Sequence, residues 1–175
     1  RHDDDADPSD GLDHGDVYDL SSHKAKVNGD VVTKTEFENR QVQVLQSRPE
    51  AYLSLKGLGF IAIERKNYDE AVKHLVASLS QNPYQVPLSF TIPATRLIDA
   101  KKFEHARKII EIGEWSYPRS AEIQFLLAHS LFGMNERKKA VEKANLAAGL
   151  DPAGIHLVFD ELHLTGRDAG DAYRT

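Results

Sequence analysis

The sequence predicts an all-α fold made of stacked pairs of antiparallel helices. Between Asn67 and Pro83, apolar residues recur at four-residue intervals as on one face of an amphipathic helix: Ala71, Leu75 and Leu79. An alanine and a proline then return together at spacings of 35 and 34 residues: Ala71, Ala106 and Ala140; Pro83, Pro118 and Pro152. A period near 34 residues is typical of helix pairs that bury their apolar faces against one another.

Composition excludes several functional classes. The absence of Cys excludes disulfides, thiolate metal sites and a cysteine nucleophile. The net charge is −5, but residues 1–19 contain eight Asp and one Arg, so the rest of the chain carries about +2. A nearly neutral body argues against nucleic-acid binding by charge. No apolar run approaches the roughly 18 residues that a membrane span needs. We therefore expect a soluble protein, cytoplasmic or periplasmic, with the compartment left open.

The first fifty residues are predicted to form a tail, a hairpin and a helix. Residues 1–24 are acidic and poor in apolar side chains, which predicts a flexible tail. In the segment 25–50, Asn28-Gly29 between β-branched residues indicates a short hairpin. A helix should follow, with a capping box of Thr33 with Glu36 or of Thr35 with Glu38. The string 27–37 also resembles the opening of parvulin-linked periplasmic chaperones.

Residues 52–154 resemble the tetratricopeptide repeat (TPR) family in three repeats, 52–86, 87–120 and 121–154. The first repeat has these residues at the signature positions: Leu55, Leu58, Gly59, Ala62, Ala71, Leu75, Ser78 and Pro83. The second has Phe90, Pro93, Ala94, Leu97, Ala106, Ile110, Gly113 and Pro118, and the third has Gln124, Leu127, Ala128, Leu131, Ala140, Ala144, Ala147 and Pro152. The resemblance implies a right-handed superhelical array of antiparallel helix pairs, a TPR solenoid.

Two residues depart from this pattern. Pro93 falls inside a predicted helix, where it removes one hydrogen bond, so we expect a kink or an early break between Ser89 and Pro93. Gln124 stands where the family has a bulky residue, which predicts looser packing of the third repeat on the second.

The C-terminal part is predicted to cap the array. Residues 155–165 read as a short helix covering the last apolar face, and 166–175 as a tail. His156, Asp160 and His163 are spaced to share one helical face, so a metal site is one hypothesis and the polar side of a capping helix is the other. No catalytic constellation and no cofactor motif is found, so we expect a non-enzyme without a cofactor.

The TPR resemblance implies partner binding in a concave groove lined by the first helix of each pair. Carried over residue by residue, this groove comprises Leu53, Lys56, Phe60, Ile63, Thr91, Thr95, Asp99, Glu122, Phe125, His129 and Phe132. Of the five polar residues with which one subclass grips acidic chaperone tails, only Lys56 is present, so that ligand is disfavoured. The prediction is an adaptor for an apolar or amphipathic protein segment. A self-assembling scaffold (a homo-oligomer) and a substrate-holding chaperone for secreted clients remain as alternatives.

Overall fold

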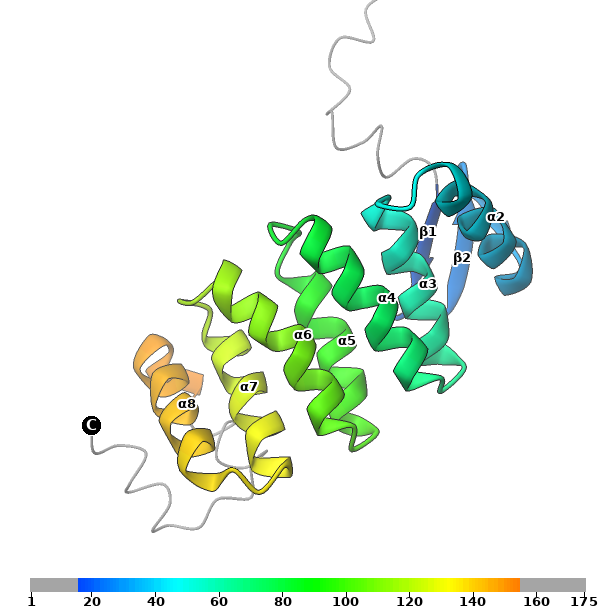
Figure 1. Cartoon of the computed structure of the whole chain (residues 1–175). Helices are drawn as coiled ribbons and strands as arrows, with labels where there is room; N and C mark the ends of the chain where they lie inside the picture. The colour runs from blue at the N-terminus through cyan, green and yellow to red at the C-terminus, as the bar shows by residue number, and fades with distance from the viewer. Residues whose placement is uncertain (1–15, 155–175) are drawn as a thin grey trace, which may run out of the picture. The chain divides into compact units, whose positions relative to one another are not determined.

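The computed structural model describes residues 16–154 and confirms the helical-repeat fold (Figure 1). Its contacts divide the chain into two compact units, residues 1–82 and 83–175. The described part contains seven α-helices and one small antiparallel sheet. Within residues 16–154, none of the helices has the length and apolar content that a membrane crossing requires.

Unit 1 begins with a three-stranded sheet rather than a two-stranded hairpin. Its strands are β1 (Asp16–Asp19), β2 (Lys24–Val27) and β3 (Asp30–Val32), paired antiparallel in the order β1-β2-β3. The predicted turn joins β2 to β3, with positive φ at Asn28 (51°) and Gly29 (86°).

The predicted flexible tail of residues 1–24 is therefore wrong for residues 16–24. Tyr18 and Leu20 are buried, and Tyr18 packs against the ring of Phe37 with 6.0 Å between ring centroids. Because the residues around them are acidic and polar, the composition of this segment does not indicate that Tyr18 and Leu20 are buried. The chain between β1 and β2 is also ordered locally, because Asp19 Oδ1 accepts the Ser21 amide at 2.8 Å.

Helix α2 (Lys34–Ser47) follows the sheet and starts with the first of the two predicted capping boxes. The Glu36 amide donates to Thr33 Oγ1 at 3.1 Å, and the Thr33 amide donates to the Glu36 carboxylate at 3.4 Å. The helix buries Phe37 and Gln41. A Cβ at Gly57 of the next helix would lie 2.7 Å from Phe37 Cζ, so this glycine allows α2 to approach closely.

Helices α3 (Tyr52–Glu64) and α4 (Tyr68–Gln81) form the first helix pair. Gly59 permits their close contact, because a Cβ there would lie 2.5 Å from Leu75 Cγ. Ala71 is fully buried in the same interface. Ser78 Oγ donates to the Tyr52 carbonyl at 2.7 Å and ties the end of α4 to the start of α3.

Unit 2 contains two further helix pairs in the segments where the repeats predict them. The elements are α5 (Leu88–Asp99), α6 (Phe103–Ser116), α7 (Ala121–Gly133), α8 (Arg137–Leu150) and a 3₁₀ turn, η1 (Pro152–Gly154). The small residues at the repeat positions are all buried: Ala94, Ala106, Ala128 and Ala140.

The two departures from the repeat pattern are both accommodated inside unit 2. Helix α5 continues through Pro93, so the predicted early break is wrong, while a kink stays a prediction. Pro93 is the sixth residue of α5, and its missing amide affects the carbonyl of Ser89 near the helix start. Gln124 is 2% exposed, and its Nε2 donates to the Pro118 carbonyl at 3.0 Å. This amide thus links α7 to the turn before it, in place of a bulky apolar contact.

The three turns within the helix pairs share one geometry. Each contains a non-glycine residue in the left-handed region: Lys66 (φ 58°), Lys101 (φ 59°) and Asn135 (φ 61°). The next amide donates to a carbonyl five residues earlier at 2.8–2.9 Å: Asn67 to Ala62, Lys102 to Leu97 and Glu136 to Leu131. This is the Schellman ending of a helix, in which glycine is the usual left-handed residue.

Candidate functional site

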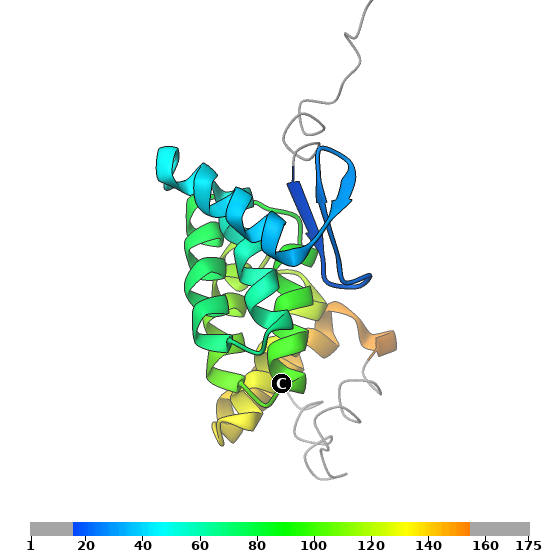
Figure 2. The same cartoon turned by 90° about the vertical axis from the view of Figure 1, so that its right-hand side faces the viewer.

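In unit 1 the predicted groove face of α3 is covered by the chain's own N-terminal sheet. Glu64, at the end of α3, contacts His23 Nδ1 at 2.6 Å and Lys34 Nζ at 3.9 Å, and β1 packs against α3 (Figure 2). Phe60 lies one helical turn before Glu64 and is 7% exposed, and Ile63 is also buried. As described, Phe60 and Ile63 present no surface to a partner.

The other two predicted groove residues of unit 1 are half-buried. Lys56 Nζ lies 5.7 Å from the centroid of the Phe60 ring, a cation–π distance that holds the lysine against the helix. Leu53 lines a pocket of about 400 Å³ together with Arg40, Arg48 and Tyr52. Only the edge of the predicted groove is therefore open in this unit.

On α5 the predicted residues divide between core and surface. Thr91 is 2% exposed and belongs to the core, whereas Thr95 and Asp99 are exposed. Leu88, at the start of the same helix, is 58% exposed. Leu88, Thr95 and Asp99 follow one another at helical spacing, so they lie along one accessible face of α5.

On α7 the predicted residues are one exposed carboxylate and several half-buried aromatic side chains. Glu122 is exposed, while Phe125 and Phe132 are half-buried and pack on the Ala128–Ala144 contact between α7 and α8. The His129 ring lies near two phenylalanine rings, 6.0 Å from Phe125 and 6.4 Å from Phe103. His129 therefore belongs to an aromatic cluster that α6 shares. Helix α5 also contacts α7 within unit 2.

We call this surface the α5–α7 face and define it by its accessible and half-buried residues: Leu88, Thr95, Asp99, Glu122, Phe125 and Phe132.

The sequence reasoning missed an exposed aromatic pair in unit 2. Trp115 and Tyr84 are 67% and 68% exposed, with ring centroids 5.9 Å apart. The Tyr117 hydroxyl donates to the Gln85 carbonyl at 2.8 Å, which stabilises the backbone next to Tyr84. The signal available was the chain's single Trp near the end of a helix, at a position outside the repeat signature.

Unit 1 also has a groove of about 810 Å³ between α2, α3 and α4. Its lining includes the apolar residues Val42, Leu58 and Ala62, the Arg65–Glu38 ion pair, and His74, whose Nε2 lies 2.9 Å from Glu70 Oε1. No Ser, Thr or Cys is among the residues that line this groove. Across residues 16–154, no cluster of three or more His, Cys, Asp or Glu is arranged to hold a metal ion. The proposed ligands His156, Asp160 and His163 lie outside the described residues, as do the predicted capping helix, the C-terminal tail and residues 1–15 of the N-terminal tail.

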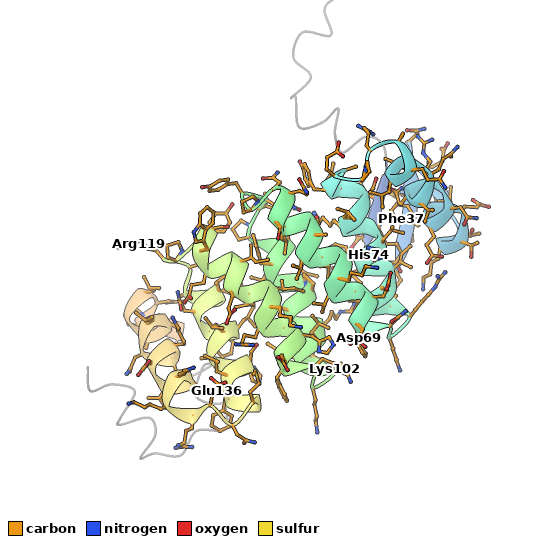
Figure 3. The ribbon with its side chains drawn as sticks, viewed as in Figure 1. Phe37, Asp69, His74, Lys102, Arg119 and Glu136 are labelled. Atoms are coloured by element: carbon orange, nitrogen blue, oxygen red, sulfur yellow. The ribbon has the colours of Figure 1, made fainter. Side chains whose placement is uncertain are left out.

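Figure 3 shows how the polar side chains are distributed over the described residues, with His74 on α4 and Lys102 and Glu136 at turns within helix pairs. Hydrogen bonds from the Ser21 amide, and then from Ser22, lower the pKa of the Asp19 carboxyl. Asp19 is exposed at the end of β1 and accepts the Ser21 amide of the turn that follows, so this shift reflects local turn structure rather than a reactive site.

Comparison with solved structures finds the same arrangement of helices in MamA. The structure of MamA 41-end from Desulfovibrio magneticus RS-1 matches with a TM-score of 0.54 and 17% identity, over 79% of this chain and 81% of that chain. A second MamA structure matches with a TM-score of 0.55 and 15% identity, over 81% and 85% of the two chains. No family model and no curated protein matches the sequence. MamA contains TPRs, so the chain has a TPR-like fold.

Proposed function

We propose that this protein is a non-enzymatic interaction module that binds an apolar or amphipathic segment of a partner protein on the α5–α7 face. The observation that carries the proposal is accessible apolar surface on two helices, α5 and α7, that contact each other. Leu88 is 58% exposed on α5, and the adjoining α7 presents Phe125 and Phe132 half-buried. Exposed apolar surface of this kind, with polar residues around it, is typical of protein-binding sites.

The charges on the same face favour an amphipathic segment with basic residues. Asp99 lies at the end of α5 and Glu122 at the start of α7, and both are exposed. A partner segment with apolar side chains on one side and Lys or Arg at its margins would match both the apolar centre and these carboxylates. The interaction role also agrees with the TPR-like fold, although fold alone assigns no partner.

The proposal places the site in unit 2. In unit 1 the N-terminal sheet already covers the corresponding face of α3, with Phe60 and Ile63 buried. A partner on that face would have to displace the sheet and break the contacts of Glu64 with His23 and Lys34.

The test is a displayed peptide library selected on the full chain, followed by affinity measurements with the selected peptides. Leu88→Glu combined with Thr95→Glu should weaken binding by tenfold or more, because both substitutions put charge on the α5–α7 face. Leu146→Glu is the matched control, since Leu146 is 48% exposed on α8. Circular dichroism should show the same helix content in all three proteins.

Each alternative has a distinct outcome in this experiment. Peptides that bind the Leu88→Glu/Thr95→Glu protein as tightly as the wild type would refute the assignment of the face. A selection that returns many unrelated apolar peptides of similar affinity would favour the substrate-holding chaperone. A molecular mass that rises with concentration in sedimentation, and falls with these substitutions, would favour the self-assembling scaffold.

A further inference from the structure

The pocket of about 400 Å³ in unit 1 has the lining of a small-ligand site. It lies between β1, the C-terminal half of α2 and the first turn of α3. Half-buried apolar side chains form part of its wall, namely Val44, Tyr52 and Leu53, and Arg40 and Arg48 contribute two guanidinium groups. An apolar wall with a few polar groups, at this volume, is typical of pockets that bind small molecules. We call it the Ser54 pocket, after the residue described next.

Ser54 contributes a buried hydroxyl to this pocket. It is the third residue of α3, is 6% exposed and belongs to the pocket lining. No group within residues 16–154 forms a hydrogen bond with the Ser54 hydroxyl. The buried hydroxyls of Ser78 and Ser130, in contrast, donate to main-chain carbonyls at 2.7 and 2.9 Å. Because buried hydroxyls normally have a partner, the one that lines a pocket is a candidate contact for a ligand.

The first main-chain amides of α3 belong to the same lining. The pocket includes Tyr52, Leu53 and Ser54, and α3 begins without a side-chain cap and without an acidic residue in its first turn. The first helical hydrogen bond runs from the Leu55 amide to the Ala51 carbonyl at 3.1 Å, so the amides of residues 52–54 have no acceptor in the described part of the chain. Together with the Ser54 hydroxyl, these donors favour a ligand that carries negative charge.

The charges of the lining indicate which kind of anion fits. Asp16 Oδ2 accepts from Gln41 Nε2 at 2.7 Å and lies 3.3 Å from Arg40 Nε, so Asp16 and Arg40 offset each other. Arg48 is exposed, and among residues 16–154 its guanidinium has no ion-pair partner. Glu50 is the second carboxylate of the lining. Two cations and two carboxylates leave the lining neutral, which suits a singly charged carboxylate better than a doubly charged phosphate.

We propose that the Ser54 pocket binds a carboxylate attached to a short apolar group. The carboxylate accepts hydrogen bonds from the Arg48 guanidinium, the Ser54 hydroxyl and the amides that begin α3, and the apolar group packs on Val44 and Leu53. A free aliphatic acid and the last residue of a polypeptide both have this chemistry. The pocket belongs to unit 1 and shares no residue with the α5–α7 face, so the proposal does not depend on the protein-binding site of unit 2.

The test uses three small probes on the full isotope-labelled chain. The first is 4-methylpentanoate, a free acid, and the second is N-acetyl-leucine, which represents a chain terminus. The third is N-acetyl-leucinamide, which lacks the carboxylate. NMR shifts of the Leu53 and Ser54 amides measure binding. Acids of this size should bind with a dissociation constant on the order of 1 mM, and N-acetyl-leucinamide should bind at least about tenfold more weakly. The acid that binds more tightly identifies the source of the carboxylate.

Four variants separate recognition in the pocket from net charge. Arg48→Gln should weaken binding of the acids about fivefold, and Ser54→Ala about threefold with an unchanged melting temperature, since the hydroxyl has no partner to lose within the described residues. Glu50→Gln should strengthen binding about twofold, because it removes a carboxylate from the lining. Arg119→Gln is the matched control, as Arg119 is exposed outside the pocket and also has no ion pair among residues 16–154. Its effect should be negligible.

Three results would overturn the proposal. One is equal affinity for N-acetyl-leucine and N-acetyl-leucinamide, since the carboxylate would then contribute nothing. Another is an affinity for the acids that Arg48→Gln and Arg119→Gln reduce equally, which would reflect net charge alone. The third is the absence of shifts at Leu53 and Ser54 with either acid at about 20 mM, whether or not inorganic phosphate, run in parallel, shifts them. None of these results bears on peptide binding at the α5–α7 face.

Discussion

Replacing Gly57 by Ala should destabilise unit 1 although alanine is the better helix former. A Cβ at position 57 would lie 2.7 Å from Cζ and 2.9 Å from Cε1 of Phe37. The Phe37 ring is 1% exposed and packs on Tyr18, so it has no free space into which to move. Overpacking of this kind costs about 1–3 kcal/mol. The gain in helix propensity is up to about 1 kcal/mol, so the expected net loss reaches about 2 kcal/mol.

Gly149→Ala is the matched control for this prediction. Gly149 lies near the end of α8 with nothing within 4 Å of a built Cβ, so its replacement should stabilise by about 0.5 kcal/mol. Urea unfolding followed by circular dichroism measures both variants. A second substitution, Phe37→Leu, should remove most of the penalty of Gly57→Ala in a double-mutant cycle. If Gly57→Ala stabilised the protein as Gly149→Ala does, the packing of α2 and the sheet against α3 would be refuted.

Three further predictions concern turns and the sheet. Lys101→Gly should raise stability by about 0.5 kcal/mol in thermal unfolding, because glycine relieves the φ of 59° at some cost in unfolded-state entropy; a loss of stability would contradict the Schellman geometry. Glu64→Gln should destabilise unit 1 by about 1 kcal/mol in urea unfolding, since it weakens the contacts with His23 and Lys34, whereas Glu50→Gln, at an exposed position before α3, should change little. Asp19 has a folded-state pKa below its ordinary value of 3.8, so its stabilising contribution is complete above that pH and is lost as the pH falls through the folded-state pKa. Asp19→Asn should therefore make acid unfolding below pH 4 slightly less steep, and an unchanged slope would argue against the Ser21 contact.

The helix pairs could be predicted from the sequence because their determinants recur. Gly59, Ala94 and Ala128 each stand where two helices meet, and a larger side chain would clash at every such crossing. Small residues that recur at one spacing can be recognised in a single sequence. The alanine and proline markers therefore located the elements to within a few residues.

The first strand could not be predicted, because its anchors depend on tertiary contacts. Tyr18 and Leu20 are buried only because α2 and α3 provide surfaces for them. Tyr18 alone, among aspartates, does not produce the alternation of apolar and polar residues that indicates a strand. The continuity of α5 through Pro93 likewise depends on tertiary packing, because the burial of Phe90 and Leu97 outweighs one lost hydrogen bond.

The candidate site was predicted in part. Thr95, Asp99 and Glu122 are accessible as the TPR resemblance implies, but Phe60, Ile63 and Thr91 are buried. The resemblance describes the repeats alone and contains no information about a sheet placed over α3.

The most direct test of the central claim is an NMR titration of the isotope-labelled full chain with a peptide selected from the library. The account predicts that the largest shifts occur on the α5–α7 face, at Leu88, Thr95, Glu122 and Phe125, and that Leu146 and the α2–α4 groove are unaffected. Largest shifts at the Tyr84–Trp115 pair or along α3 would contradict the claim that this protein recognises its partner through helices α5 and α7 of unit 2.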